Sequence, residues 1–229
     1  MPKRNALALF DIDGTLIRRA GPHHKEALIA GIRKVTGLET NMEGIATAGT
    51  LDRDLLTLML RRMGWNDASV SNVLSDVMTA CHASYGENCP ADLRDRVCPG
   101  LPDLLEELKS RGASLGVVSG NLREIGRRKL ELAGLWSYFS IGAFSEDGHT
   151  RSELAHKAAQ HAALAENAGS FRRISLVGDH ANDVAAAKAN GFRSVAVATG
   201  LSSAEELAAV SPDLVLRDLT EADPALFFP

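Results

Sequence analysis

The sequence has few cysteines, no excess of basic residues and no long apolar run. Its three cysteines, Cys81, Cys89 and Cys98, are odd in number and lack CxxC spacing, which argues against a disulfide framework or a zinc site. The net charge of −4 and the scattered basic pairs do not indicate a nucleic-acid partner. No apolar run is long enough to cross a bilayer, and the first residues lack a signal-peptide pattern. We therefore expect a cytoplasmic protein with neither a membrane nor a nucleic-acid partner.

The composition is that of an ordinary globular protein. The chain has 229 residues, of which 45% are hydrophobic and 24% are charged. This length allows one large domain, or one domain with an insert. A short apolar helix face would serve either a core or a dimer interface, so both a monomer and a homodimer are compatible with the sequence.

An apolar run over residues 6–10 ends in two carboxylates, Asp11 and Asp13, which are followed by Gly14. Such a run predicts a buried parallel strand, and the glycine marks the point where the chain leaves the sheet. Open α/β sheets bind their ligands at the carboxyl ends of strands, so Asp11 and Asp13 are candidate site residues. Two close anions repel, and a hard cation such as Mg²⁺ would neutralise them. The alternative is a strand followed by an acidic turn, because Asp-Gly is a common turn pair.

The order of the remaining elements predicts the fold. The insert after the first strand has predicted helices over 25–35, 52–63 and 67–85. From residue 101 onward, predicted helices over 101–111, 122–133, 152–165 and 182–190 alternate with strands over 113–118, 139–144, 174–177 and 194–198. This alternation predicts an α/β fold with a doubly wound, Rossmann-like parallel sheet, and a helical cap inserted after the first strand.

We assign residues 1–16 and 92–229 to the α/β core domain and residues 17–91 to the cap domain. An insert that begins directly after the acidic pair would lie over the site, where it can exclude water and select the substrate. The alternative is that the insert only adds core or a dimer face.

Two later strand ends also carry polar side chains. Ser119, Gly120 and Asn121 follow an apolar strand, and a hydroxyl with backbone N–H groups at such a junction forms a cradle for phosphate oxygens. The alternative is that Ser119 or Asn121 caps the following helix. Asp179 ends another strand, and Asp183 would face the same way four residues later if that turn is helical. One of these carboxylates could bind a metal while the other holds a metal-bound water or orients a neighbour.

A phosphate site beside carboxylates also requires a fixed cation, because phosphoryl oxygens and a nucleophilic carboxylate repel. Arg151 lies in a predicted loop just before a helix, from which its side chain could point into the site. Lys157 lies inside that helix, where a solvent-exposed face is the ordinary expectation. We prefer Arg151, and Lys157 is the alternative.

Taken in order, four segments resemble the motifs of the haloacid dehalogenase-like (HAD) hydrolase superfamily. They are DIDGT at 11–15, SGN at 119–121, Arg151, and GDHAND at 178–183. The resemblance covers essentially the whole chain and is strongest to the phosphoglycolate phosphatase-like branch with a helical cap. The first and last motifs are specific when they occur in this order. The family usually has Lys, often followed by Pro, at the third motif, whereas this chain has Arg151, which keeps the charge in a different shape.

The resemblance implies a Mg²⁺-dependent phosphomonoester hydrolase that acts on a small phosphorylated metabolite through an aspartyl-phosphate intermediate. It implies that Asp11 attacks phosphorus and that Asp13 serves as general acid and base. Mg²⁺ would bind the Asp11 carboxylate, the Asp13 backbone carbonyl and Asp179, while Asp183 would act through water or a neighbouring residue. The implied phosphate-binding residues are Thr15, Ser119, Gly120, Asn121 and Arg151.

Two other functions remain open. A phosphomutase of the same fold, of the β-phosphoglucomutase type, would use the same core residues. A non-catalytic regulatory protein could keep the fold without turnover, although it would have no physical need for the clustered carboxylates.

The cap segment around Thr50 resembles a Gly-x-Thr-Asp loop of this branch, and it supplies two candidate specificity residues. These are Thr50 and Arg53, of which Arg53 could contact an anionic group of the substrate. The alternative is that Thr50 caps a helix and Arg53 lies in its solvent-exposed first turn.

Overall fold

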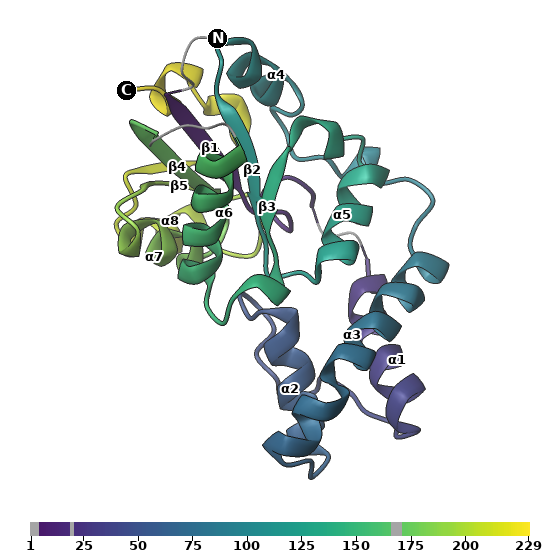
Figure 1. Cartoon of the computed structure of the whole chain (residues 1–229). Helices are drawn as coiled ribbons and strands as arrows, with labels where there is room; N and C mark the ends of the chain where they lie inside the picture. The colour runs from purple at the N-terminus through teal and green to yellow at the C-terminus, as the bar shows by residue number, and fades with distance from the viewer. Residues whose placement is uncertain (1–4, 19–20, 166–170) are drawn as a thin grey trace.

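The computed structural model describes residues 5–18, 21–165 and 171–229. Within these residues, six parallel strands form one sheet in the order β3-β2-β1-β4-β5-β6 (Figure 1). The strands are β1 (Ala6–Phe10), β2 (Ser114–Val118), β3 (Ile141–Ala143), β4 (Arg173–Gly178), β5 (Arg193–Val197) and β6 (Leu214–Leu216). This is the order of a doubly wound sheet, in which the direction of strand progression reverses between β1 and β4.

Helices cover both faces of this sheet and form a separate group below it. They are α1 (His23–Thr36), α2 (Asp52–Arg62), α3 (Asp67–Asn88), α4 (Asp103–Ser110), α5 (Arg123–Leu132), α6 (Arg151–Ala165), α7 (Ala181–Ala189) and α8 (Ala204–Ala209). Short 3-10 segments lie at Arg94–Arg96, Trp136–Tyr138, Ser145–Asp147, Leu219–Glu221 and Pro224–Phe227.

Strand β1 lies in the middle of the sheet and is buried on both faces. Ala8 and Phe10 pack into one apolar cluster with residues of α4 and α5. Leu7 and Leu9 pack into another cluster with residues of α6 and α7. Successive side chains of a strand point to opposite faces, so a strand between two helical layers needs an apolar residue at every position. This explains the continuous apolar run that precedes Asp11.

Helices α1, α2 and α3 are inserted between β1 and β2 and lie together below the sheet in Figure 1. They share an apolar cluster of their own, which includes the buried Leu28, Leu56 and Val77. The cluster continues onto the core through Leu122 and Ile125 at α5. We call α1, α2 and α3 the cap helices. The division of the chain into domains at residues 16/17 and 91/92 stays a prediction.

The predicted fold class is confirmed, since the structure is a doubly wound parallel α/β sheet with a helical insert after the first strand. Every predicted helix and strand overlaps an observed one. Among the α-helices and strands of the described residues, β6 and α8 were not predicted, and neither were the 3-10 segments. Helix α8 starts with a capping box in which the side chains of Ser203 and Glu206 each bond the other's backbone N–H. None of the helices in the described residues combines the length and the apolar character that spanning a bilayer requires.

Candidate active site

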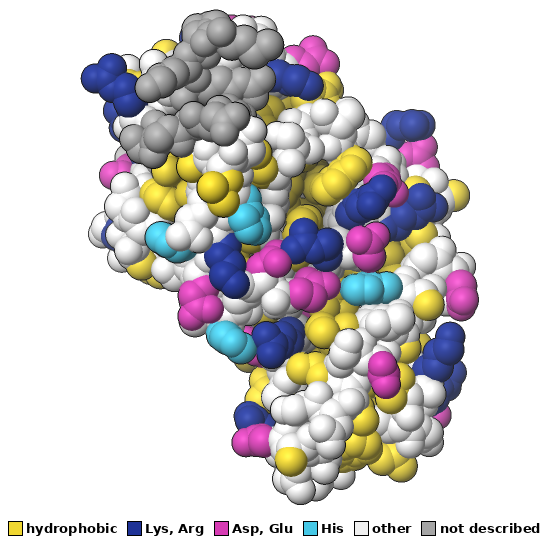
Figure 2. Space-filling view, in the orientation of Figure 1, with side chains coloured by type: hydrophobic (Ala, Val, Ile, Leu, Met, Phe, Trp, Pro, Cys, Tyr) yellow, Lys and Arg dark blue, Asp and Glu magenta, His cyan; other side chains and the backbone are white. Residues whose placement is uncertain are grey.

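Three adjacent strand ends converge at one edge of the sheet. Strands β1, β2 and β4 are neighbours and run parallel, so Asp11, Ser119 and Asp179 follow them at the same edge. This edge faces the cap helices, because the backbone N–H of Asp52 in α2 donates to the Gly120 carbonyl at 2.8 Å. On the face shown in Figure 2, charged and histidine side chains gather across the middle of the molecule, between the sheet and the cap helices.

The carboxylates of Asp11, Asp179 and Asp183 form a buried cluster. One oxygen of each lies within 4.8 Å of the others, and all three residues are buried. Asp183 lies in the first turn of α7, where its Oδ2 accepts a hydrogen bond from the His180 backbone N–H at 3.2 Å. Three carboxylates in so small a volume repel one another unless protons or a cation neutralise them.

The glycines of the first and last motifs make room for this cluster. A Cβ on Gly178 would lie 2.3 Å from Cγ of Asp183. A Cβ on Gly14 would lie 2.4 Å from Oδ2 of Asp179, and Gly14 has a φ of +92°, which other residues rarely adopt. Both glycines are therefore required by the close approach of a carboxylate to the backbone.

The cluster raises the pKa of two of its members. Burial raises the pKa of Asp11 well above its usual range, the Arg151 guanidinium opposes this effect, and Asp183 and Asp179 add to it. Burial and the neighbouring Asp183 raise the pKa of Asp179 to about 7. Without a cation the cluster thus retains protons, which a divalent cation would displace.

Arg151, the first residue of α6, is the cation next to the predicted nucleophile. Its Nη1 donates to Asp11 Oδ1 at 3.0 Å and to the Val118 carbonyl at 3.2 Å. Its Nε lies 3.1 Å from Asp183 Oδ1, close enough for an ion pair but without hydrogen-bond alignment. The side chain is only 10% exposed, so its charge acts on the cluster with little screening by solvent.

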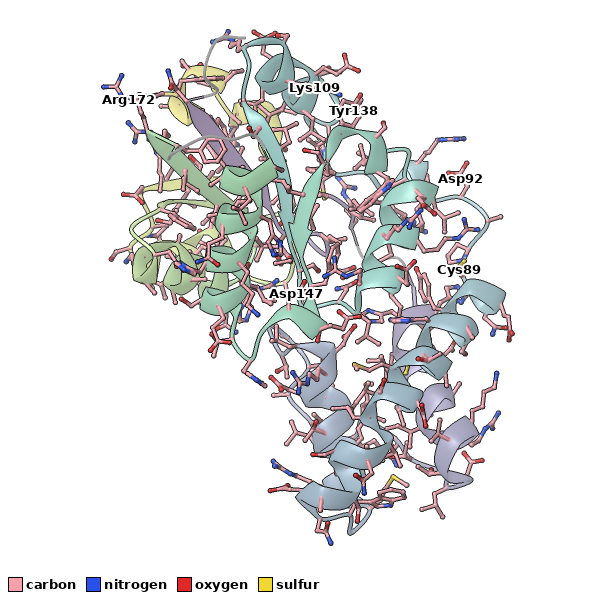
Figure 3. All side chains as sticks on the ribbon, in the orientation of Figure 1. Cys89, Asp92, Lys109, Tyr138, Asp147 and Arg172 are labelled. Carbon is pink, nitrogen blue, oxygen red and sulfur yellow. The ribbon has the colours of Figure 1, made fainter. Side chains whose placement is uncertain are left out.

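Lys157, the alternative cation, lies elsewhere. Its side chain is exposed, and Nζ donates to the backbone carbonyl of Asp147. Asp147 is labelled in Figure 3 at the end of the core nearest the cap helices. Of the two candidates, only Arg151 contacts the carboxylate cluster.

Asp13 has a different environment from that of Asp11. Asn121 Nδ2 donates to Asp13 Oδ2 at 2.7 Å, and Lys129 Nζ lies 2.8 and 2.7 Å from the two carboxylate oxygens. Partial burial would by itself raise the pKa of Asp13, but the Lys129 ammonium holds that pKa below its usual range. The two carboxylates of the first motif therefore differ in their neighbours, because Asp11 faces two carboxylates and one guanidinium, whereas Asp13 faces an ammonium and an amide.

A cavity of about 740 Å³ lies at this edge and is lined by residues of both the sheet edge and the cap helices. Its volume suits a small molecule. The predicted site residues that line it are Asp11, Asp13, Thr50, Gly120, Asn121, Arg151 and Asp179. The predicted residues Thr15, Ser119, Arg53 and Asp183 are not part of this lining.

Thr15 and Ser119 are fully buried and make local contacts. Thr15 Oγ1 points to Asp179 Oδ1 at 3.5 Å, the long limit of a hydrogen bond. Ser119 Oγ accepts from the Asn121 backbone N–H at 3.3 Å. Both hydroxyls thus support neighbouring site residues, and a direct contact with phosphate stays a prediction for each.

The two candidate specificity residues lie at the start of α2. Thr50 lines the cavity, and its hydroxyl donates to the Ala46 carbonyl at 2.9 Å. The N-cap residue of α2 is Leu51, so the alternative that Thr50 caps the helix is wrong. Arg53 lies in the first turn, and its backbone N–H donates to Ser145 Oγ at 2.8 Å.

Three residues of the site received no role in the sequence analysis, namely Lys129, His24 and Asp52. Lys129 follows the buried Ile125 by four residues, so it lies on the apolar stripe of α5, and that position was the available signal. His24 and Asp52 come from different cap helices, and their 2.7 Å contact leaves no trace in the sequence spacing.

The carboxylate cluster fits a hard divalent cation. Its ligand atoms are carboxylate oxygens, which Mg²⁺ prefers, and three carboxylates face one guanidinium, which leaves excess negative charge. Among the described residues, the buried Oδ1 of Asp183 has no hydrogen-bond partner. The identity of the ion stays a prediction.

A family model described as haloacid dehalogenase-like hydrolase matches residues 6–191. The chain therefore belongs to the haloacid dehalogenase-like hydrolase family, as the order of its motifs predicted. Hydrolases of this family generally use a divalent metal, in agreement with the acidic cluster.

The curated relatives include several phosphoglycolate phosphatases. The one from Agrobacterium fabrum is 26% identical over 227 residues, which cover 96% of this chain and 92% of the relative. The one from Synechococcus elongatus is 33% identical over 127 residues, which cover only 54% of this chain and 58% of the relative. A solved β-phosphoglucomutase from Clostridium difficile has a TM-score of 0.67 at 17% identity, over 95% of this chain and 93% of the other, which shows a common fold. The curated relatives support the prediction of a phosphatase enzyme.

Proposed function

We propose that this protein is a Mg²⁺-dependent phosphatase that hydrolyses phosphomonoesters of small metabolites through an aspartyl-phosphate intermediate. One observation carries the proposal. The carboxylate of Asp11 is held 3.0 Å from Arg151 within an acidic cluster, and both Asp11 and a second, differently tuned carboxylate, Asp13, line one cavity. A nucleophile, a cation for the phosphoryl group and a separate acid are the groups that this reaction needs.

In the first step, a carboxylate oxygen of Asp11 attacks the phosphorus of the bound ester, and the bond to the leaving oxygen breaks. The negative charge of the bound ester would raise the pKa of Asp13 against the effect of Lys129, and the protonated Asp13 donates to that oxygen, so the product departs as a neutral alcohol. In the second step, water attacks the phosphorus of phosphorylated Asp11 while Asp13 accepts a proton from the water. This step releases inorganic phosphate and restores both carboxyl groups.

Arg151 and the backbone N–H groups of Gly120 and Asn121 would hold the transferring group, whose charge they offset. The Mg²⁺ would be held by the carboxylates of Asp11 and Asp179 and the backbone carbonyl of Asp13. When bound, the ion supplies positive charge for the phosphoryl oxygens.

The cap helices would close the cavity over the ester. We propose that residues 17–91 form a cap domain on a core of residues 1–16 and 92–229, and that Thr50 and Arg53 tune the choice of substrate. The cavity of about 740 Å³ accommodates a small metabolite, and the names of the relatives make phosphoglycolate the first ester to test. The cytoplasm as compartment, and a monomer or homodimer as assembly, remain predictions from the sequence.

A phosphomutase is the second candidate, because a β-phosphoglucomutase shares the fold over most of both chains. It would use Asp11 and Asp13 in the same way but would return the phosphoryl group to another hydroxyl of a sugar phosphate. The site residues alone do not separate the two reactions.

The test is phosphate release from a panel of phosphomonoesters, including phosphoglycolate and p-nitrophenyl phosphate, with Mg²⁺ present. Wild-type protein is expected to release phosphate, and Asp11→Asn is expected to lose at least roughly 1,000-fold because the nucleophile is removed. No release from any ester would overturn the proposal. Transfer between positions of a sugar phosphate without net release would favour the mutase.

A further inference from the structure

Lys129 on α5 has a buried ammonium that contacts the proposed general acid. Its Nζ lies 2.8 and 2.7 Å from the oxygens of Asp13 and donates to Asn121 Oδ1 at 2.7 Å. Asn121 in turn donates to Asp13 Oδ2 at 2.7 Å. Lys129 is 1% exposed, whereas the Asp13 side chain is 38% exposed and lines the cavity. Asp13 is thus held from its buried side and keeps an open side toward the cavity.

The remaining contact of the ammonium leads to the cap helices. Lys129 Nζ lies 3.1 Å from His24 Nδ1 on α1, and His24 Nε2 lies 2.7 Å from Asp52 Oδ2 at the start of α2. A lysine only donates and a carboxylate only accepts, which assigns Nδ1 as the acceptor and Nε2 as the donor of a neutral imidazole. We call Asp13, Asn121, Lys129, His24 and Asp52 the Lys129 network.

Asp52 fixes one end of this network to the core. Its Oδ2 accepts from the Leu122 backbone N–H at 2.7 Å, and its own N–H donates to the Gly120 carbonyl at 2.8 Å. His24 therefore lies between a cap residue that is docked on the core and the ammonium that holds Asp13. Withdrawal of α1 would remove one acceptor from Lys129 and expose its ammonium to water, which would weaken its attraction to Asp13.

We propose that Lys129 is a positioning residue that aims Asp13 at the leaving oxygen, and that His24 and Asp52 make this aim depend on the cap helices. The proposal rests on the role of Asp13 in the proposed function. A buried ion pair contributes little net stability, because desolvation offsets most of the attraction between its charges. The Lys129 ammonium donates to Asp13, Asn121 and the His24 imidazole, and His24 in turn contacts Asp52 at the start of α2. This arrangement suits a role in holding Asp13 in one orientation.

Two esters with different leaving groups distinguish a loss of general-acid positioning from a general loss of stability. Departure of p-nitrophenolate needs little protonation because the anion is stable, whereas propyl phosphate must be protonated at its leaving oxygen. Lys129→Met keeps the length of the side chain and removes its charge and its donors. We expect kcat for propyl phosphate to fall about 100-fold, which is the size of a lost general-acid contribution. For p-nitrophenyl phosphate we expect kcat to fall less than about 5-fold.

His24→Asn interrupts the same network from the cap side. We expect kcat for propyl phosphate to fall about 10-fold, again with a smaller loss for p-nitrophenyl phosphate. A double variant should have the same kcat for propyl phosphate as Lys129→Met, because both changes act through one contact. Arg128→Met is the matched control, since Arg128 lies on the same helix, is exposed and pairs with Glu131. Its ratio of the two kcat values should equal that of the wild type.

The outcomes distinguish this proposal from the function on which it rests. Equal losses on the two esters in Lys129→Met, or no loss, would overturn the positioning role and leave the phosphatase standing. Failure of wild-type protein to release phosphate from any ester of the wider panel would overturn the phosphatase itself. Thermal unfolding is recorded for each variant. Where Lys129→Met does not fold, the ester ratio of His24→Asn decides, and an unchanged ratio there overturns the proposal.

Discussion

The carboxylate of Asp179 lies directly against the backbone of Gly200. A Cβ on residue 200 would fall 1.6 Å from Asp179 Oδ2, so no side chain fits there unless the carboxylate moves. Gly200 lines the cavity and lies outside the four motifs of the family. The absence of a side chain at position 200 thus leaves the room that the carboxylate of a predicted metal ligand occupies.

Gly200→Ala is expected to displace Asp179 and weaken Mg²⁺ binding. The loss in metal affinity or activity should be about 10- to 100-fold, the usual effect of disturbing the surroundings of a ligand. The measurement is a Mg²⁺ titration of phosphatase activity. Gly86→Ala is the control, because Gly86 lies in α3 with nothing within 4 Å of its Cβ. It should keep full activity and raise the free energy of unfolding by about 0.5–1 kcal/mol. Superimposable titrations for Gly200→Ala and wild type would contradict this account.

Replacement of Arg151 tests whether the guanidinium shape matters at the third motif. A lysine keeps the charge but cannot contact Asp11, the Val118 carbonyl and Asp183 from one planar group. Arg151→Lys should lower kcat roughly 10-fold, and Arg151→Met roughly 100- to 1,000-fold, as for other groups that stabilise developing negative charge. Lys157→Met, on the same helix, should stay within about twofold of wild type. A larger loss in Lys157→Met than in Arg151→Met would reverse the assignment.

The carboxylates at the strand ends were predictable because parallel strands bring their carboxyl ends to one edge of a sheet. That rule placed Asp11 and Asp179 together although they are far apart in the sequence. Strand β6, three residues at one edge of the sheet, was not predicted. The capping box before α8 did carry a signal, which an interpretation based on apolar patterns overlooked.

Lys129 shows where the sequence stops being informative about the site. It follows Arg127 and Arg128, and a run of basic residues in a helix ordinarily predicts a solvent-exposed face. Its position on the apolar stripe of α5 indicates burial, but the partner that makes burial acceptable is Asp13, in a distant segment. Lys129 and Asp13 come together only because α5 packs near the end of β1.

The three cysteines should differ in reactivity toward a thiol reagent. Burial raises the pKa of Cys81 to about 12 and that of Cys98 to about 11, so neither presents a thiolate at neutral pH. Cys89, labelled in Figure 3 at the end of α3, is only partly buried. Labelling of the folded protein with Ellman's reagent should show one fast thiol, and Cys89→Ser should remove that phase. A second fast thiol in the native protein would be inconsistent with this packing.

The acidic cluster predicts how pH changes the effect of Mg²⁺ on stability. The pKa of Asp11 is raised, and that of Asp179 is raised to about 7 from an ordinary 3.8. At pH values between the ordinary and the raised pKa, the metal-free folded protein binds more protons than the unfolded chain. The contribution of Asp179 to stability is therefore fully present below the ordinary pKa and is lost as the pH rises through about 7, and the raised pKa of Asp11 acts in the same direction. Mg²⁺ binds the ionised carboxylates, so it should restore stability mainly at the higher pH.

Thermal unfolding in EDTA and in MgCl₂, at about pH 5.5 and about pH 8, measures this difference. Addition of Mg²⁺ should raise Tm more at the higher pH, because at the lower pH the ion competes with protons for the same oxygens. Asp179→Asn removes one anionic ligand of the ion. Most of the Mg²⁺-dependent rise in Tm should therefore be lost in this variant. The same Mg²⁺ shift at both pH values would show that the ion binds elsewhere, as would a full shift in Asp179→Asn protein. In either case the carboxylate cluster would lose its assignment as the metal site.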